Sequence, residues 1–220
     1  MALETIELNP EQEPTHSIIV LHGLGADGND FYPVAQQLQG QLKSPTRFVL
    51  PNAKKWPITI NGGMNMPAWY DMKSLEHPRD IGWDSFEDSY KEISSLIKGE
   101  IENGISPENI FIAGFSQGGV MALFTTISYP EKLGGIIALS TYWIQNNDLS
   151  IEASNHKYSI FMGHGLSDPI IPLEIGKQSA SELTSMGHDV TWKQYPMPHS
   201  VCMDEINDIL HWLKSINDNL

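Results

Sequence analysis

The sequence predicts an α/β fold in which helices cover both faces of a mostly parallel β-sheet. Short apolar runs without alternation, typical of strands buried on both faces, recur along the whole chain. Segments with helical periodicity separate them, and this alternation favours parallel pairing. Right-handed crossovers then place the carboxyl ends of the strands along one edge of the sheet, where ligands bind in such folds. We therefore look for functional residues in the loops that follow the strands.

The predicted strands are short and bounded by glycine, proline or polar residues. Residues 3–8 alternate between apolar and polar side chains and stop at a proline, which predicts a short edge strand. Further strands are predicted at residues 16–21, 47–50, 109–113, 135–139, 158–162 and 190–195, of which 16–21, 135–139 and 158–162 have the apolar character of buried strands.

The predicted helices show apolar residues at helical spacing. The first covers residues 31–42, and Asn29 or Asp30 can cap it. The second begins at Ser85, in a stretch that resembles a capping box, and ends at Gly104. Further helices are predicted at residues 117–129, 173–186 and 201–216.

Composition limits the classes of protein that this chain can belong to. With 220 residues and 40% hydrophobic content, the sequence suits one domain, residues 1–220, with a substantial core. A net charge of −14, from 27 acidic and 13 basic residues, disfavours nucleic acid as a partner. We expect no signal peptide and no membrane-spanning segment. The single cysteine, Cys202, excludes an intramolecular disulfide and fits a cytoplasmic protein.

Residues 52–83 form the longest segment without a helical period. The segment is rich in tryptophan, methionine, proline and glycine, and it is too apolar for a solvated linker. Long irregular segments in compact domains usually have a function. We predict an irregular apolar loop that covers the active site, with an ordinary packed surface loop as the alternative.

The chemistry is predicted to depend on residues 113–119, with the sequence AGFSQGG. An apolar strand precedes this stretch and a helical run follows it, so it predicts a sharp turn that presents Ser116 at the sheet edge. Side chains at positions 114 and 118 would collide with the strand and the helix, and glycine removes the collision. The helix that begins at Gln117 directs its free N–H groups at the place where charge develops in acyl transfer.

A serine nucleophile needs a histidine to accept its proton and a carboxylate to orient that histidine. Ser116, Asp168 and His199 each follow the carboxyl end of a predicted strand. They therefore share one edge of the sheet, and the order Ser, Asp, His is that of an α/β-hydrolase. We predict these three residues as the catalytic triad.

Other residues compete for these roles. His22 ends a strand but precedes the serine, so we expect it to structure the glycine-rich loop after it. His164 shares a loop with Asp168 and is expected to form a structural hydrogen bond there. Asp148 is the rival acid, whereas Asp189 begins a strand and lies at the wrong edge. The remaining histidines are predicted to lie at the surface: His16, His77, His156, His188 and His211.

The tetrahedral intermediate of acyl transfer needs two N–H donors. The amide of Gln117 directly follows the nucleophile, and the amide of Leu24 lies in the glycine-rich loop after an early strand, so we predict these two as the oxyanion hole. No paired His or Cys spacing indicates a metal site. The predicted substrate contacts are Leu24, Met64, Trp69, Trp143 and Leu166.

Five motifs occur in order along the chain: LHGLGADG at 21–28, NGGM at 61–64 with AWYD at 68–71, GFSQGG at 114–119, HG at 164–165 with Asp168, and PM at 196–197 with HSV at 199–201. Together they resemble the bacterial carboxylesterase and acyl-protein thioesterase family. The resemblance implies an α/β-hydrolase with no large cap domain and no cofactor. It supports Ser116, Asp168 and His199 as the triad, with Leu24 and Gln117 as oxyanion donors, and it makes a homodimer plausible.

The hypothesis from sequence is a serine hydrolase that cleaves carboxylic esters or thioesters through an acyl-enzyme intermediate. Its substrates are small-molecule esters or acylated lipids and proteins, with short to long acyl chains. Two alternatives remain, a lysophospholipase and a non-catalytic protein that holds an acyl-like ligand, because the fold alone does not establish catalysis.

Overall fold

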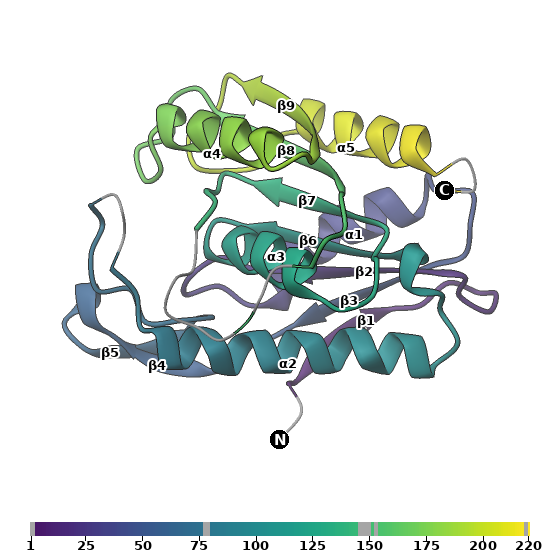
Figure 1. Cartoon of the computed structure of the whole chain (residues 1–220). Coiled ribbons are helices and arrows are strands. Elements are labelled where there is room, and N and C mark those ends of the chain that lie inside the picture. Colours follow the sequence, from purple (N-terminus) through teal and green to yellow (C-terminus); the bar gives the residue numbers. More distant parts are fainter. Residues whose placement is uncertain (1–2, 77–79, 145–150, 152–153, 218–219) are drawn as a thin grey trace.

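The computed structural model describes residues 3–76, 80–144, 151, 154–217 and 220 (Figure 1). Its main sheet has seven strands in the order β1-β3-β2-β6-β7-β8-β9. The strands are β1 (Thr5–Leu8), β2 (His16–Leu21), β3 (Thr46–Pro51), β6 (Ile110–Phe115), β7 (Gly135–Leu139), β8 (Ser159–Gly165) and β9 (Asp189–Tyr195). Only β1 runs antiparallel to its neighbour, so the predicted mostly parallel sheet with a short edge strand is confirmed.

Helices cover both faces of this sheet (Figure 1). They are α1 (Tyr32–Gln39), α2 (Trp83–Glu102), α3 (Gln117–Ser128), α4 (Leu173–Ser185) and α5 (Met203–Ile216), with short 3₁₀ turns η1 (Gly28–Phe31), η2 (Thr59–Asn61) and η3 (Pro107–Asn109). Successive residues of one strand enter different cores: Ile19 packs with α2 and α3, whereas Ile18 packs with α1 and α5. Burial on both faces explains why the inner strands, such as β2 and β7, are unbroken apolar runs in the sequence.

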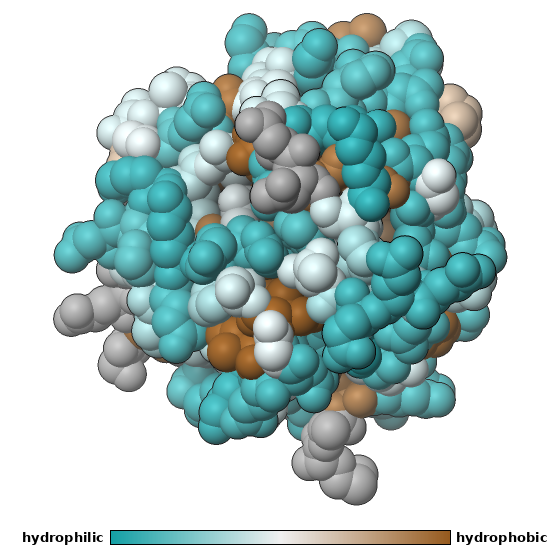
Figure 2. Space-filling model, turned by 90° about the vertical axis from the view of Figure 1, so that its right-hand side faces the viewer, coloured by the Kyte–Doolittle hydropathy of each residue, from teal (hydrophilic) through white to brown (hydrophobic). Residues whose placement is uncertain are grey.

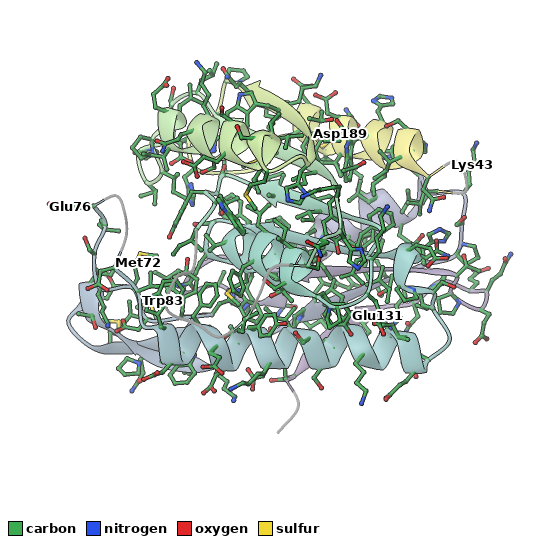
Figure 3. All side chains as sticks on the ribbon, viewed as in Figure 1. Lys43, Met72, Glu76, Trp83, Glu131 and Asp189 are labelled. Carbon is green, nitrogen blue, oxygen red and sulfur yellow. The ribbon has the colours of Figure 1, made fainter. Side chains whose placement is uncertain are left out.

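Because the parallel strands share one direction, they all begin at one end of the molecule and finish at the other (Figure 3). Lys43 and Glu131, which precede β3 and β7, lie at the end where the strands begin. Met72 and Trp83 lie at the opposite end, with the carboxyl ends of the strands. Figure 2 looks onto the first end and shows mainly hydrophilic side chains there. The segment 52–83 therefore reaches the edge at which the functional residues were predicted.

Part of residues 52–83 is regular, so the expectation of a wholly irregular loop is wrong. The antiparallel strands β4 (Lys55–Ile58) and β5 (Met64–Pro67) form a separate two-stranded sheet. Gly62 and Gly63 adopt left-handed φ values of 67° and 79° in the connection between them. Glycine tolerates this conformation at little cost, and an Asn-Gly pair is a strong hairpin signal. Prolines in both strands hide the alternation that would otherwise have indicated them.

The predicted capping box at Ser85 does not form. The helix α2 begins two residues earlier, with Gly82 as its cap. The hydroxyl of Ser85 instead donates to the carbonyl of Gly82 (2.7 Å) and accepts from the amide of Asp71 (2.9 Å). Because a distant segment supplies the donor, the local motif alone could not reveal this role.

The cap of the first helix also lies elsewhere. Neither Asn29 nor Asp30 caps α1; Asp27 caps the preceding turn η1 by accepting from the amide of Asn29 (2.8 Å). The chain then continues through η1 into α1, so the polar residues at 29 and 30 lie inside η1 rather than in front of a helix.

Two histidines that were predicted at the surface are buried. His16 contacts the hydroxyl of Thr15 (2.9 Å), and His188 accepts from the amide of Tyr158 (3.2 Å). Burial lowers the pKa of both rings. His156 is half-buried, His211 is exposed, and His77 lies outside the described residues.

The carboxyl group of Glu205 is buried, and neither of its oxygens has a hydrogen-bond partner among the described residues. Glu205, in the first turn of α5, has no exposed surface and packs directly onto Gly163 of β8, where a Cβ would collide with its carboxyl group. Burial raises the pKa of Glu205 to about 8, against the opposing effect of the Cys202 amide, while the charge of Asp208 adds to the rise. The folded state therefore favours the protonated acid.

This raised pKa predicts that stability falls as the pH rises. The folded protein keeps the proton of Glu205 up to about pH 8, whereas an unfolded glutamate releases it near its ordinary pKa of 4.5. Stability from this group is complete below that value and is lost at up to about 1.4 kcal/mol per pH unit through the interval. We expect Glu205→Gln to melt higher than the parent at pH 8, with a difference that shrinks towards pH 5. Parallel melting curves at all pH values would contradict the assignment.

Candidate active site

Ser116 stands at the junction of β6 and α3 in a strained backbone conformation. Its φ of 54° and ψ of −117° lie where L-residues are rare. A Cβ on Gly114 would collide with the backbone of Gly118, and a Cβ on Gly118 would collide with the carbonyls of Leu21 and His22. The flanking glycines thus permit the close contact of β6, α3 and the end of β2, as the sequence predicted.

The loop after β7 supports this turn. The amide of Ser116 donates to the carbonyl of Leu139 (2.9 Å), and the hydroxyl of Thr141 donates to the carbonyl of Ser116 (2.7 Å). Ser140, between these two residues, has a φ of 45°. Thr141 is not among the site residues predicted from the sequence, although it follows the carboxyl end of a strand at the same edge of the sheet.

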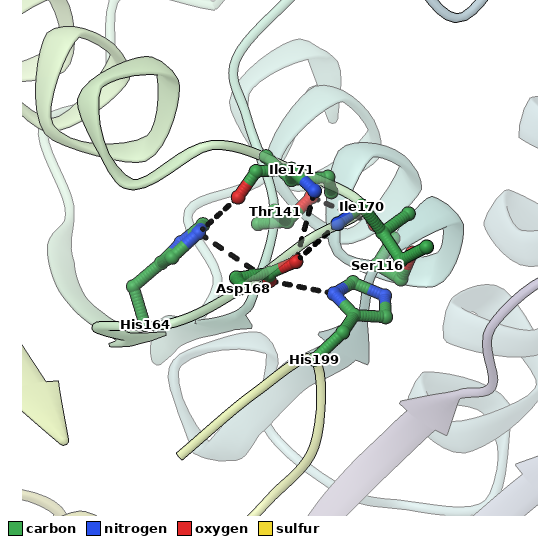
Figure 4. A network of polar contacts seen from close by, with 7 residues as sticks. All are labelled: Ser116, Thr141, His164, Asp168, Ile170, Ile171 and His199. Carbon is green, nitrogen blue, oxygen red and sulfur yellow. Dashed lines mark hydrogen bonds and ion pairs between the residues drawn. The ribbon is translucent and has the colours of Figure 1, made fainter. Parts of the chain in front are cut away.

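Asp168 is held in place by backbone amides and faces His199 (Figure 4). Its Oδ1 accepts bonds from the amides of Ile170 (2.8 Å) and Ile171 (2.9 Å). Its Oδ2 accepts from Nδ1 of His199 at 2.7 Å. The side chain of Asp168 is fully buried, so the bond to His199 is shielded from water.

His199 connects the acid to the neighbourhood of the serine. Its ring packs on Phe115, with ring centroids 4.7 Å apart, and Phe115 directly precedes Ser116. Figure 4 shows the ring beside Ser116, with Nδ1 turned towards Asp168. Because Nδ1 donates to the carboxylate, Nε2 of the neutral ring keeps a lone pair that can accept a proton. The three predicted residues therefore converge at one site.

His164 lies on the other side of Asp168 from His199, and its ring stabilises the loop that follows β8. Its Nε2 donates to the carbonyl of Ile171 (2.9 Å) and lies 3.5 Å from Oδ2 of Asp168. Burial lowers the pKa of His164, which favours the neutral ring. The expected structural hydrogen bond to this loop is present.

His22 has both ring nitrogens engaged by backbone groups. Nε2 accepts from the amide of Ala53 (3.0 Å), and Nδ1 donates to the carbonyl of Gly23 (2.7 Å). Burial lowers the pKa of this ring also. His22 therefore fixes the loop that follows β2 and has no nitrogen left for proton transfer.

Two backbone amides remain available beside the serine. In the glycine-rich loop, the amide of Gly25 bonds to Pro67 and that of Ala26 bonds to Gly23. Among the described residues, no acceptor is bonded to the amide of Leu24, and the amide of Gln117 is a free first-turn donor of α3. A Cβ on Gly23 would lie 3.7 Å from the Cβ of Ser116, so this loop borders the nucleophile. The arrangement suits the binding of an oxyanion.

Comparison with known proteins identifies the family. The model of the phospholipase/carboxylesterase family matches residues 3–217. The chain belongs to this family. It is 37% identical over 225 residues to acyl-protein thioesterase 1 of Kluyveromyces lactis, covering 97% of each chain, and 38% identical over 213 residues to acyl-protein thioesterase 1 of Saccharomyces cerevisiae, covering 92% of this chain and 93% of the other. These relatives are fungal, so the comparisons support the family as a whole and not the specifically bacterial resemblance that the sequence suggested.

Solved structures of related proteins confirm the α/β-hydrolase fold. SOBER1 of Arabidopsis thaliana superposes with a TM-score of 0.79 at 29% identity, covering 91% of this chain and 98% of that chain. Acyl-protein thioesterase 2 of Zea mays shares the fold with a TM-score of 0.81 at 23% identity, covering 97% and 98%. As a member of the phospholipase/carboxylesterase family, this protein hydrolyses esters or thioesters.

The predicted substrate contacts of this family member fall into two groups. Met64 and Leu166 are 63% and 49% exposed, and Leu24 and Trp143 are half-buried, so all four side chains can meet a ligand. Trp69 has no exposed surface, and its indole N–H donates to the carbonyl of His22 (2.8 Å). This burial argues against the predicted contact of Trp69 with substrate, because an aromatic-rich segment can equally supply core residues.

In the described part of the chain, no helix combines the length and apolar character needed to cross a membrane. The same residues contain no cluster of three or more His, Cys, Asp or Glu side chains that could hold a metal ion. The rival acid Asp148 lies outside the described residues.

The contacts of Asp168 predict the effect of removing its charge. We expect Asp168→Asn to lower kcat by about 10⁴-fold, because a neutral amide neither fixes the required tautomer of His199 nor stabilises its cation. Asp148→Asn should retain activity, as should Asp189→Asn at the opposite edge of the sheet. Steady-state hydrolysis of a nitrophenyl ester measures all three. Loss of activity in Asp148→Asn, with Asp168→Asn active, would transfer the role of the acid.

Proposed function

We propose that this protein is a serine hydrolase in which Ser116 is the nucleophile, His199 the general base and Asp168 the orienting acid. The observation that carries the proposal is the buried 2.7 Å bond between Asp168 and His199, on a ring that packs against the residue before the strained serine. The amides of Leu24 and Gln117 complete the site as oxyanion donors.

The reaction runs in two acyl transfers. Oγ of Ser116 attacks the ester or thioester carbonyl carbon while its proton passes to Nε2 of His199. The oxyanion that forms is stabilised by the amides of Leu24 and Gln117. His199 then gives the proton to the leaving alcohol or thiol, and the acyl group stays on Ser116. Water, deprotonated by His199, attacks this acyl-enzyme and releases the carboxylic acid.

Thioesters of acylated proteins are the substrate class that we favour within this chemistry. The fungal relatives are named acyl-protein thioesterases. The half-exposed Leu166, two residues before Asp168, offers apolar surface to an acyl chain. We place the activity in the cytoplasm, because the one cysteine leaves the fold independent of intramolecular disulfides.

Loss of the nucleophile is the direct test of this proposal. Ser116→Ala should lower kcat by about 10⁶-fold, the size of the effect in a comparable triad, while far-UV circular dichroism stays unchanged. A fluorophosphonate probe should label the parent at Ser116 and leave the variant unlabelled. Ser140→Ala is the matched control, since Ser140 also has a positive φ (45°) and its hydroxyl is buried with no hydrogen-bond partner among the described residues. Near-normal turnover by Ser116→Ala, or silence of the parent towards the probe, would support a ligand-binding protein instead.

The substrate class predicts a dependence on acyl-chain length. In a series from acetyl to hexadecanoyl, as oxygen esters and as thioesters, kcat/KM should rise with length as the chain buries apolar surface. Leu166→Ser should lower kcat/KM for long chains by about 10-fold while leaving the acetyl ester, which has no long chain to bury there, unaffected. Equal losses for short and long chains would remove Leu166 from the acyl site. A preference for lysophospholipids over both series would favour the lysophospholipase alternative.

A further inference from the structure

The two proposed oxyanion donors belong to segments far apart in the sequence. Leu24 lies in the loop after β2, and Gln117 begins α3. Donors work when both lie about 2.7–3.1 Å from the oxygen that they stabilise, so their spacing must be fixed before the substrate binds. Residues 67–70, which follow the hairpin of β4 and β5, bond to both segments. We call them the 67–70 segment.

The 67–70 segment holds the glycine-rich loop by two hydrogen bonds. The carbonyl of Pro67 accepts from the amide of Gly25 (2.8 Å), the residue after Leu24. The indole of Trp69 donates to the carbonyl of His22 (2.8 Å), and the rings of Trp69 and His22 lie 5.2 Å apart. Bonds on both sides of Leu24 thus fix the direction of its amide.

The same segment holds the nucleophile turn through the side chain of Gln117. The Oε1 atom of Gln117 accepts from the amide of Trp69 (2.8 Å), and its Nε2 donates to the carbonyl of Tyr70 (2.8 Å). Both polar groups of a side chain that is only 1% exposed are therefore satisfied by the 67–70 segment. The backbone amide of the same residue remains free for the oxyanion.

The 67–70 segment is itself anchored to parts of the fold that carry neither donor. The amide of Ala68 donates to the carbonyl of Lys54 (2.9 Å), and the hydroxyl of Ser89, on α2, donates to the carbonyl of Trp69. Ala68, Trp69 and Tyr70 have no exposed surface. A buried and anchored segment resists displacement, so it can act as a rigid spacer between the two donors.

We propose that the 67–70 segment sets the spacing of the oxyanion hole, with Trp69 and the side chain of Gln117 as positioning residues. Trp69 acts on Leu24 through the carbonyl of His22, and the Gln117 side chain aligns its own backbone amide. Neither side chain touches the substrate. This inference rests on the proposed function, because it presupposes that Leu24 and Gln117 stabilise an oxyanion.

Trp69→Phe tests the first contact by removing the indole N–H and keeping an aromatic ring beside His22. Because the oxyanion contact is made in the transition state, we expect kcat to fall about 10- to 100-fold, with KM changed by less than about threefold. The affinity for an alkyl boronic acid, whose adduct with Ser116 places an oxygen in the hole, should fall by a similar factor. Binding of an unreactive ether analogue of the substrate should stay unchanged.

Phe111→Leu is the matched control for loss of buried aromatic volume. Phe111 is buried in β6 near the end where the strand begins, away from both donors. It should lower the melting temperature while kcat and the boronic acid affinity stay near those of the parent. A general loss of stability would therefore not reproduce the pattern expected of Trp69→Phe.

Gln117→Met tests the second contact, since it removes both side-chain bonds and keeps the backbone amide. We expect a similar fall in kcat, and a double variant with Trp69→Phe that loses less than the product of the two single effects, because both act through one element. This variant also keeps the inference testable if Trp69→Phe does not fold.

The outcomes separate this inference from the proposed function. If Ser116→Ala is inactive but Trp69→Phe and Gln117→Met keep the kcat and boronic acid affinity of Phe111→Leu, the spacing role is refuted and the serine hydrolase stands. If Ser116→Ala retains activity, the proposed function itself is refuted. If both variants raised KM by as large a factor as they lowered kcat, the inference would also be overturned, since that result would indicate a general distortion of the site.

Discussion

The strained backbone conformation of Ser116, with φ of 54° and ψ of −117°, is the constraint on which the site depends. A non-glycine residue in this region costs about 1–3 kcal/mol, so the surrounding fold must hold it there. Three features do so: the glycines at 114 and 118, which let β6, α3 and the end of β2 meet without side chains; the bond from the Ser116 amide to Leu139; and the fully buried helix α3 behind the turn. The conformation presents the hydroxyl and frees the next amide at the same place.

Three histidines at this edge differ through the partners of their ring nitrogens. His22 has both nitrogens bonded to backbone groups, and His164 donates to a carbonyl in a fully buried position. Burial lowers the pKa of both rings, so they act as neutral struts for the loops that carry Leu24 and Asp168. His199 alone of these three is partly exposed and bonded to the carboxylate, which leaves its second nitrogen for proton transfer.

The fold was largely predictable from sequence, because strands that are buried on both faces of a parallel sheet have unbroken apolar runs. The edge strand β1, the buried strands β2, β3, β6, β7 and β8, and the partly exposed edge strand β9 all lie within a few residues of their predicted positions. The predictions failed where a distant partner changes a local preference. Ser85 bonds to Asp71 instead of forming a capping box, and the prolines of β4 and β5 hide a hairpin that the Asn-Gly pair at 61–62 could have indicated. His16 and His188 are buried, and each has a polar contact with a distant residue: Nε2 of His16 with the side-chain amide of Asn217 (3.2 Å), and Nδ1 of His188 with the amide of Tyr158 (3.2 Å).

By itself, the sequence determined the chemical inventory of this protein: a serine between two glycines, an acid and a histidine, each after a strand of a sheet with a single direction. Parallel strands place such residues at one edge, so position along the chain was sufficient to nominate Ser116, Asp168 and His199. Only the tertiary structure decided which of the surrounding residues can contact the substrate and which are buried and hold the site in position. Trp69 and the side chain of Gln117 show this division, because both are buried by segments that are remote in the chain. Composition records that a tryptophan is present, but the direction of its N–H depends on packing, which no local pattern encodes.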